Sequence, residues 1–328
     1  MTATTRVEQL WTDSREQEHM RPGEAGAFRL LRVDPTAQLD AYAGIDSDQQ
    51  PLIAIGIKRR PPSIAVDSSA LSYFRKQRSD GSWLMVLRLC DPILAPVFAR
   101  LCQDLMEQAA GVSDESELVS LFCTRLELWL RLFRLSGDGI LAPNEARGLM
   151  AELLVLEQFI ENGRRDVRAV LAGWKGPLGA DQDFQFEDET LEVKARTAGV
   201  ATVTISSLEQ LSSPVRTRLA VVTLQASTPG SDGAFDLNTL VARIEGKLAP
   251  DEQALQLLQE RLLEARYVEH EAYAGMTSQL VAIDVFRVEA DFPRLSREAV
   301  LPAIATATYS LELSEIGAWR DARGLQDD

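Results

Sequence analysis

Three residues in the middle of the chain, Asp183, Glu192 and Lys194, have the types and spacing of a metal site. Residues 183–194 predict two short strands around a tight polar turn, and strand alternation places Glu192 and Lys194 on one face. A two-residue loop would set Asp183 opposite Glu192, and a four-residue loop would set it opposite Lys194. Either loop gathers the three side chains on one face, with opposite Cβ atoms about 5 Å apart. A loop of odd length would separate them.

The chemistry expected of this face is metal-assisted hydrolysis of a phosphate ester. Two carboxylates at that separation repel each other, which raises one pKa unless a cation lies between them. A hard divalent ion, Mg²⁺ or Mn²⁺, prefers such oxygen ligands. It would polarise a phosphoryl oxygen and lower the pKa of a bound water, while Lys194 orients that water or stabilises the developing charge. The alternative is a solvated hairpin face on which Glu192 and Lys194 form a weak ion pair.

The elements that must position these residues follow from the apolar patterns of the second half of the chain. The expected elements are a helix over 144–163, a strand over 164–176, two strands over 183–197, a short helix over 203–213 and a buried strand over 218–227. The predicted order is helix, strand, strand, strand, helix, strand. Two helices, 235–248 and 251–267, should follow, and then a hairpin or pair of strands around 279–291 and 307–316.

The first half predicts a different organisation, in which strands precede helices. Short apolar segments separated by turn residues predict strands over 27–34, 51–58, 62–67 and 82–89, and longer patterns predict helices over 95–110 and 116–133. The turn-rich segment 136–145 separates the halves. We therefore predict an α+β N-terminal domain, residues 1–139, and a second domain, residues 140–328, with a mixed sheet in the α/β class.

Composition limits the classes of function. The chain has 328 residues, of which 45% are hydrophobic and 25% charged, as expected of an ordinary globular protein. Its net charge of −15 weighs against a free-standing, high-affinity DNA clamp, although bound metal ions and a few local cations can reverse the field at one site. The sequence predicts no membrane span, no signal peptide and reduced cysteines, and hence a cytoplasmic protein.

A family resemblance becomes specific at three motifs. These are Gly148-Leu149-Met150-Ala151-Glu152-Leu153, Asp183-Phe184 and Glu192-Val193-Lys194. Over about residues 140–230 the chain resembles the PD-(D/E)XK superfamily, whose restriction-endonuclease-like core has the same predicted element order. It resembles more narrowly a group of bacterial proteins found beside ATPases and DNA methyltransferases in defence gene clusters. The proline of the superfamily name is absent before Asp183.

The resemblance implies a Mg²⁺-dependent DNA endonuclease, acting as a subunit of a bacterial restriction or anti-phage defence system. DNA and proteins of the cluster, an ATPase and a methyltransferase, are the implied partners, and a homodimer is a further assembly to test. Asp183 and Glu192 would bind the metal and Lys194 would position the attacking water. The acidic charge motivates an alternative, a catalytically inactive scaffold or an acidic, DNA-mimicking subunit. A metal enzyme acting on small phosphate esters is a third reading.

Other residues are expected to support the site. Glu152 carries over as the acid that the first helix of the superfamily contributes to the metal, and Gly148 would let that helix approach the sheet closely. Arg196 continues the face of Lys194 and could meet a phosphate. Ser206 and Gln210, one helical turn apart, resemble the polar positions that contact the scissile region. Asp181 is a second candidate for the strand acid and Glu157 a second candidate for the helix acid.

Overall fold

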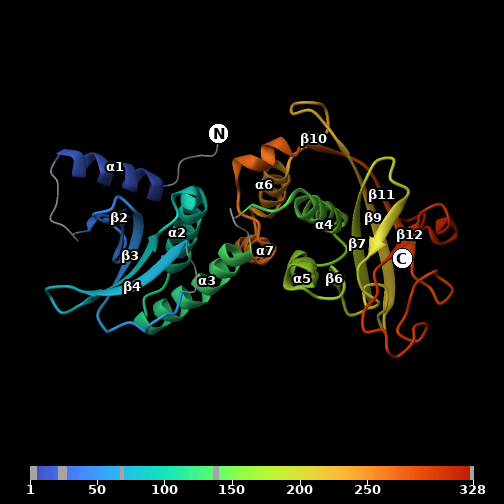
Figure 1. Ribbon diagram of the computed structural model, residues 1–328, viewed down its shortest axis with the longest axis horizontal. Coiled ribbons are helices and arrows are strands. Elements are labelled where there is room, and N and C mark those ends of the chain that lie inside the picture. Colours follow the sequence, from blue (N-terminus) through green and yellow to red (C-terminus); the bar gives the residue numbers. More distant parts are fainter. Residues whose placement is uncertain (1–5, 21–27, 67–69, 136–139, 326–328) are drawn as a thin grey trace. The chain divides into compact units, whose positions relative to one another are not determined.

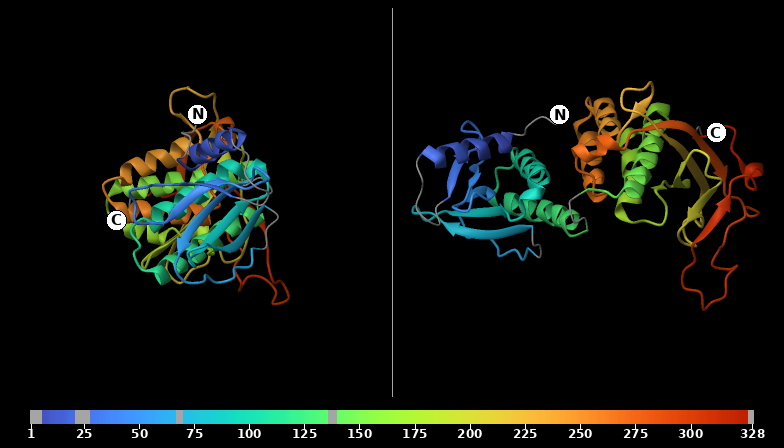
Figure 2. Two further views of the ribbon diagram at one scale, coloured as in Figure 1. Left: turned by 90° about the vertical axis from the view of Figure 1, so that its left-hand side faces the viewer. Right: turned by 45° about the horizontal axis from the view of Figure 1, so that its top comes forward.

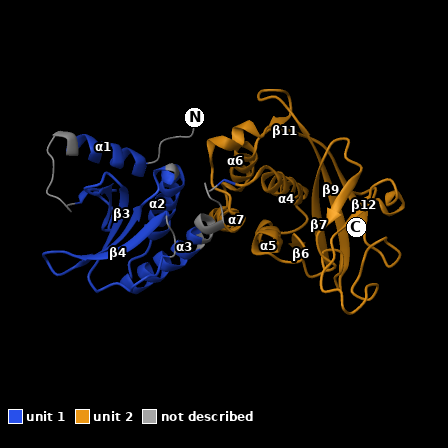
Figure 3. Ribbon diagram, viewed as in Figure 1, with its two compact units in different colours: residues 1–140 blue, residues 141–328 orange. Residues whose placement is uncertain are grey.

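The chain folds into two compact units, residues 1–140 and 141–328, in a computed structural model (Figures 1 and 3). The structure describes residues 6–20, 28–66, 70–135 and 140–325. It is a mixed α/β protein with several sheets and, within the described residues, seven α-helices. No described helix is both long enough and apolar enough to cross a membrane.

The first unit is an antiparallel sheet with helices. Its elements are α1 (Arg6–Met20), β1 (Arg29–Arg32), β2 (Ala41–Ile45), β3 (Pro51–Ile57), β4 (Leu71–Gln77), β5 (Trp83–Leu89), η1 (Pro92–Leu94), α2 (Ala95–Ala109) and α3 (Glu115–Leu135). The strand order is β1-β2-β3-β5-β4. Trp11 of α1 stacks on Phe98 of α2, with ring centroids 5.5 Å apart, and this contact joins the two helices over a shared core.

Several predictions for this unit were right and others were wrong. β1, β3, β5, α2 and α3 form where strands and helices were predicted. Residues 62–66 form no strand, and the last residue of that prediction lies outside the described residues. α1, β2 and β4 were missed. α1 is polar on average, and only its buried residues Val7, Leu10, Trp11 and Ser14 recur at helical spacing.

The second unit is built around a five-stranded mixed sheet. Its elements are α4 (Pro143–Asn162), α5 (Val167–Gly173), η2 (Gly176–Leu178), β6 (Phe184–Gln185), β7 (Glu189–Thr197), β8 (Thr202–Ile205), β9 (Arg216–Ala226), β10 (Ala234–Phe235), α6 (Leu237–Leu248), α7 (Glu252–Glu264), η3 (Glu271–Gly275), β11 (Ser278–Arg287), β12 (Tyr309–Glu312) and η4 (Gly317–Trp319). The strand order is β10-β11-β9-β7-β6, in which β7 and β9 are parallel and the other pairs antiparallel.

Helices and strands cover opposite faces of this sheet (Figures 1 and 2). α4 packs against β7, and Phe159 of α4 meets Phe184 of β6 edge to face at 5.4 Å. On the other face, Leu219 and Val221 of β9 share an apolar core with Leu311 of β12, which pairs with β8. The strands β11 and β12 therefore do not form a hairpin with each other. β11 pairs with β9 and β10, and β12 pairs with β8.

The segment 164–176, predicted as a strand, contains the helix α5 instead. The side chain of Asp166 accepts hydrogen bonds from the backbone N–H groups of Arg168 and Ala169, which is how a helix N-cap satisfies its first donors. The apolar run that suggested a strand is short, so period alone could not distinguish the two.

The segment 203–213, predicted as a helix, begins with the strand β8 and continues as turns. Val203 and Ile205 are buried whereas Thr204 is exposed, which is the two-residue period of a strand. The observed order is thus helix, helix and then four strands, from α4 to β9. The predicted alternation of elements is wrong at two places.

A buried ion pair links the two parallel strands. Glu189 of β7 and Arg218 of β9 are 1% and 0% exposed, and Nη2 of Arg218 lies 2.8 Å from Oε2 of Glu189. Arg165 also contacts Glu189, at 3.2 Å, and Nη1 of Arg218 donates to the carbonyl of Gly324 at 3.1 Å. Because both charges are out of water, each depends on the other for compensation.

Candidate active site

The β6–β7 hairpin has the shorter of the two even loops. The pairs in register are Phe184 with Leu191 and Gln185 with Thr190. The N–H of Phe186 donates to the carbonyl of Glu189 at 2.8 Å, which leaves a two-residue loop. The same register sets Asp183 opposite Glu192 at the open end of the hairpin.

Hydrogen bonds hold both the carboxylate and the backbone carbonyl of Asp183. Its Oδ2 accepts a hydrogen bond of 2.7 Å from the N–H of Val193 in β7. Its carbonyl accepts the N–H groups of Lys175 and Gly176, at 2.7 and 2.9 Å. The segment that follows α5 therefore holds Asp183 against the edge of the sheet.

Glu152 of α4 reaches the same place from the helix side. Its Oε2 accepts a hydrogen bond of 2.8 Å from the indole N–H of Trp174, whose side chain is fully buried. A Cβ added to Gly176 would lie 2.6 Å from Oε2 of Glu152 and 2.7 Å from Oδ1 of Asp183. The two carboxylates therefore converge on the space that the missing side chain of Gly176 leaves.

Glu192 and Lys194 form an ion pair beside this space. Nζ of Lys194 lies 2.6 Å from Oε1 of Glu192, which is 2% exposed. The other oxygen, Oε2, is buried and has no hydrogen-bond partner among the described residues. One buried carboxylate oxygen is thus left without compensation.

Among the described residues, the three carboxylates share one nearby cation, the ammonium of Lys194. Burial raises the pKa of Glu152 well above its usual value, with the charge of Asp183 as the next cause. Burial raises the pKa of Asp183 to about 6. Burial, followed by the charge of Asp183, raises the pKa of Glu192 to about 8. The ammonium of Lys194 does not offset this effect, so the site favours either protons or an added cation.

These residues fit a hard divalent cation. Carboxylate oxygens are the ligands that Mg²⁺ and Mn²⁺ prefer, and a buried, unsatisfied oxygen is a place where a cation would compensate. Among the described residues, no three acidic, histidine or cysteine side chains already stand close enough to hold a metal as a group. Glu152 and Asp183 converge, whereas Glu192 is engaged by Lys194.

The side chains predicted to contact the substrate bind other parts of the protein instead. Nε of Arg196 donates to Oγ1 of Thr223 at 2.8 Å, and Nη1 donates to the carbonyl of Val200 at 2.6 Å. The N–H of Ser206 donates to Oε1 of Gln210 at 2.8 Å, so these two residues bind each other in a turn. Among the described residues, neither Arg196 nor Ser206 nor Gln210 forms a hydrogen bond or an ion pair with the carboxylates of the cluster.

The second candidates for the two acids also lie apart from this cluster. Asp181 is exposed in the turn before the hairpin. Glu157 forms ion pairs with Arg243 and Lys247 of α6, and so ties α4 to that helix. A Cβ on Gly148 would meet nothing within 4 Å, so this glycine is not needed for close packing.

Sequence reasoning missed three residues of the site. Trp174 and Gly176 shape the carboxylate cluster, as described above. Gln182, which is 5% exposed, donates from Nε2 to the carbonyl of Glu209 at 2.6 Å and so links the turn after β8 to the residue before Asp183. Trp174 and Gly176, nine and seven positions before Asp183, were the available signal, and they were assigned to a strand.

Replacing Gly176 with alanine should weaken Mn²⁺ binding about 10- to 100-fold, the range seen when residues that orient metal ligands are changed. The new methyl group would displace the carboxylates of Glu152 and Asp183, although no ligand is removed. Isothermal titration calorimetry of the full chain measures the affinity. Gly148→Ala is the matched control, since its Cβ lies in open space. Equal affinities in both variants would show that the ion does not occupy this space.

Without metal, the protein should lose stability as the pH rises from about 5 to about 8. The folded state holds protons on Asp183 and Glu192 that the unfolded chain has already released, because their ordinary pKa values are near 4. The free energy of unfolding therefore falls with pH in this window. Mn²⁺ binds the deprotonated groups and should reverse the trend. Melting temperatures in chelator and in Mn²⁺ test this, and the double variant Asp183→Asn, Glu192→Gln should flatten both dependences.

Comparison with known proteins identifies one family. The sequence profile of DUF4420, described as "Putative PD-(D/E)XK family member", matches residues 7–314. No curated protein and no solved structure matches the chain.

Proposed function

The chain belongs to this PD-(D/E)XK family, as its motifs predicted, and on that premise we propose that it is a metal-dependent DNA endonuclease. Nucleases with this motif generally use divalent metal ions. The observation that carries the proposal is the convergence of Glu152 and Asp183 on the space beside Gly176, next to the buried pair of Glu192 and Lys194.

The second unit supplies the parts of a nuclease-like domain. We propose that α4, the β6–β7 hairpin and the parallel strand β9 form a restriction-endonuclease-like core within residues 140–328, and that residues 1–139 form a separate domain. The antiparallel hairpin beside a parallel strand, with α4 packed against β7, supports this assignment.

Each residue then has a distinct role. Glu152, Asp183 and Glu192 would hold Mg²⁺ or Mn²⁺, which supplies a Lewis acid for the phosphoryl oxygen and an activated water. Trp174 fixes the carboxylate of Glu152 by its hydrogen bond. The ammonium of Lys194, already beside Glu192, would orient the attacking water and stabilise charge that develops on the phosphate.

Burial of the carboxylates weighs against a catalytically inactive scaffold. Burying charge is costly, and a scaffold gains nothing from keeping the buried Glu192, one oxygen of which has no hydrogen-bond partner among the described residues, near two further carboxylates. The net charge of −15 instead favours a nuclease recruited to DNA by partner proteins. We propose that it works as a subunit of a restriction or anti-phage defence system, with an ATPase and a methyltransferase as partners.

The direct test is cleavage of supercoiled and linear DNA by the purified full chain. Cleavage should require Mg²⁺ or Mn²⁺, stop in chelator and be lost in Asp183→Asn, which keeps the size of the side chain but removes its charge. The assay is repeated with the proteins encoded beside it. Metal binding without cleavage under every condition would contradict the proposal and favour the scaffold.

A further inference from the structure

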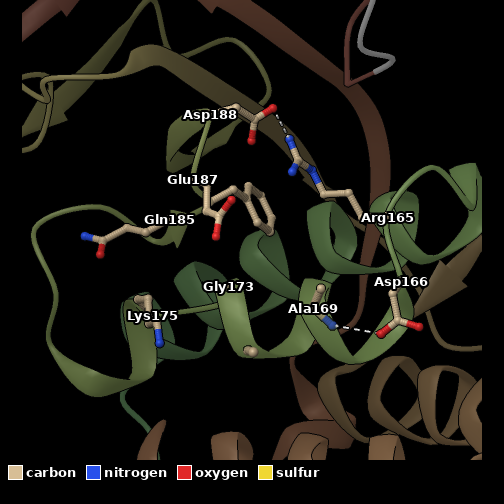
Figure 4. Close-up of a pocket in the computed structure, with 10 residues that line it drawn as sticks. Arg165, Asp166, Ala169, Gly173, Lys175, Gln185, Glu187 and Asp188 are labelled. Carbon is tan, nitrogen blue, oxygen red and sulfur yellow. Dashed lines mark hydrogen bonds and ion pairs between the residues drawn. The ribbon is translucent and has the colours of Figure 1, made fainter.

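A pocket of about 630 Å³ lies between α5 and the β6–β7 hairpin (Figure 4). Its lining residues are Arg165, Asp166, Ala169, Ala172, Gly173, Lys175, Gln185, Phe186, Glu187 and Asp188. Figure 4 shows Lys175 and Gln185 toward one end and Arg165 with Asp188 toward the other. The volume is within the range of about 300–1,000 Å³ typical of sites for small organic ligands.

The pocket borders the carboxylate cluster. Lys175 lines it, and the next residue, Gly176, lies against Glu152 and Asp183. The backbone N–H groups of Lys175 and Gly176 both bind the carbonyl of Asp183. Gln185, another lining residue, follows two positions after Asp183. Glu152, Asp183 and Glu192 do not line the pocket themselves, so its link to the carboxylate cluster runs through the backbone of Lys175, Gly176 and Asp183.

Small residues keep the pocket open on the side of α5. Ala169, Ala172 and Gly173 are three and four residues apart, so they share one face of the helix. Ala169 and Ala172 are exposed. A Cβ on Gly173 would lie 2.3 Å from Cε1 of Phe186, so glycine also permits the close approach of that ring. The result is a shallow apolar floor with polar ends.

Only one of the two cations in the pocket is already engaged. Arg165 lies 2.8 Å from Asp188 and 3.2 Å from Glu189, with its guanidinium 4.2 Å from the ring centroid of Phe186. By contrast, the ammonium of Lys175 has neither an ion pair nor a hydrogen bond with any residue that the structure describes.

This freedom distinguishes Lys175 from the other lysines of residues 141–328. The sequence has three lysines there, Lys175, Lys194 and Lys247. Lys247 is bound to Glu157 and Glu161, and Lys194 to Glu192. In a strongly acidic chain, an unengaged cation in the lining of a pocket is a place for an anionic ligand.

We propose that this pocket is a substrate subsite for one nucleotide of a DNA strand, next to the bond that is cut. The phosphate binds Lys175, and the sugar and base lie over the floor formed by Ala169, Ala172 and Gly173. The subsite rests on the proposed nuclease function, and it adds a residue and a surface that would position the strand against the carboxylates.

The test distinguishes the contribution of the Lys175 charge from that of the open space above Ala172. Binding of dye-labelled 20-mer DNA, single-stranded and duplex, is followed by anisotropy over a salt series with Ca²⁺ present. Lys175→Gln should weaken binding about 5- to 10-fold, and the slope of log affinity against log salt should fall by about 0.9 for duplex or about 0.7 for single strand, the value of one phosphate contact. Lys175→Arg should restore both. Ala172→Leu, which fills the floor without changing charge, should weaken binding and leave the slope unchanged.

Lys247→Gln is the control, because it makes the same change at a lysine outside the pocket, and it should keep the wild-type slope. Melting temperatures confirm that every variant is folded.

A wild-type slope in Lys175→Gln, wild-type affinity in Ala172→Leu, or no DNA binding by the wild type would each overturn the subsite. If the wild type cleaves DNA while these variants bind normally, only the subsite fails. If it binds no metal but Lys175→Gln lowers the slope, the nuclease function fails, and the pocket is then a DNA contact but not a substrate subsite.

Discussion

Replacing Lys194 with methionine should slow metal-dependent DNA cleavage about 10³-fold, within the range of about 10²–10⁴ expected for a group that assists proton transfer or stabilises charge. Methionine keeps the length of the side chain but removes the ammonium that lies 2.6 Å from Oε1 of Glu192. Since the carboxylates of Glu152 and Asp183 are untouched, affinity for Mn²⁺ should change far less than the rate. Single-turnover cleavage at saturating Mn²⁺, together with titration calorimetry, separates the two effects.

Arg196→Met is the matched control for this change. Arg196 follows Lys194 by two positions on the same strand, but it binds Thr223 and the carbonyl of Val200. Its loss should alter the cleavage rate only a few-fold. Equal losses of rate in both variants would contradict a specific role for Lys194 and indicate a general effect of positive charge on this strand.

Replacing Arg218 with methionine should destabilise the protein by about 3–5 kcal/mol, because it removes the fully buried partner of Glu189 and leaves the more exposed Arg165 to compensate that charge. It also removes the hydrogen bond to the carbonyl of Gly324. For a unit of this size, each kcal/mol lowers the melting temperature by about 2–4 °C. Urea denaturation of the full chain gives the free energy, and the double variant Arg218→Met, Glu189→Gln should recover part of the loss.

Arg216→Met provides the comparison on the same strand. Arg216 is two residues away, its side chain is 43% exposed, and its ion pair with Asp321 is 3.8 Å long. Exposed pairs of this kind contribute about 0–1 kcal/mol. If Arg218→Met proved as mild as Arg216→Met, then Glu189 would be compensated by Arg165 and the strands would not depend on the buried pair.

The hairpin was predictable because it depends on local chemistry. A polar turn between alternating strands placed Asp183, Glu192 and Lys194 near one another, and only the length of the loop remained open. The structure has the two-residue loop, with the hydrogen bond from Phe186 to Glu189 closing it. Their catalytic roles stay predictions that the cleavage assay tests.

The wrong secondary-structure predictions fell on short segments, in which the apolar pattern is weak. α5 has only seven residues and depends on the cap at Asp166, and β8 has only four. Such segments take their conformation from tertiary packing more than from their own period. Gly176 and Arg218 could not have been found this way, because their significance comes from residues distant in the chain, Glu152 for Gly176 and Glu189 for Arg218.

The hydrogen bond between Trp174 and Glu152 gives the site a fluorescence signal of its own. An indole that donates to a carboxylate changes its emission when that carboxylate gains a proton or a ligand, and the ring of Trp174 is sealed from solvent. The chain has five tryptophans, so the contribution of Trp174 can be isolated by comparison with a phenylalanine variant. Binding of a proton or a metal ion to the carboxylate cluster could then be followed in real time, without a label, by the fluorescence emission of Trp174.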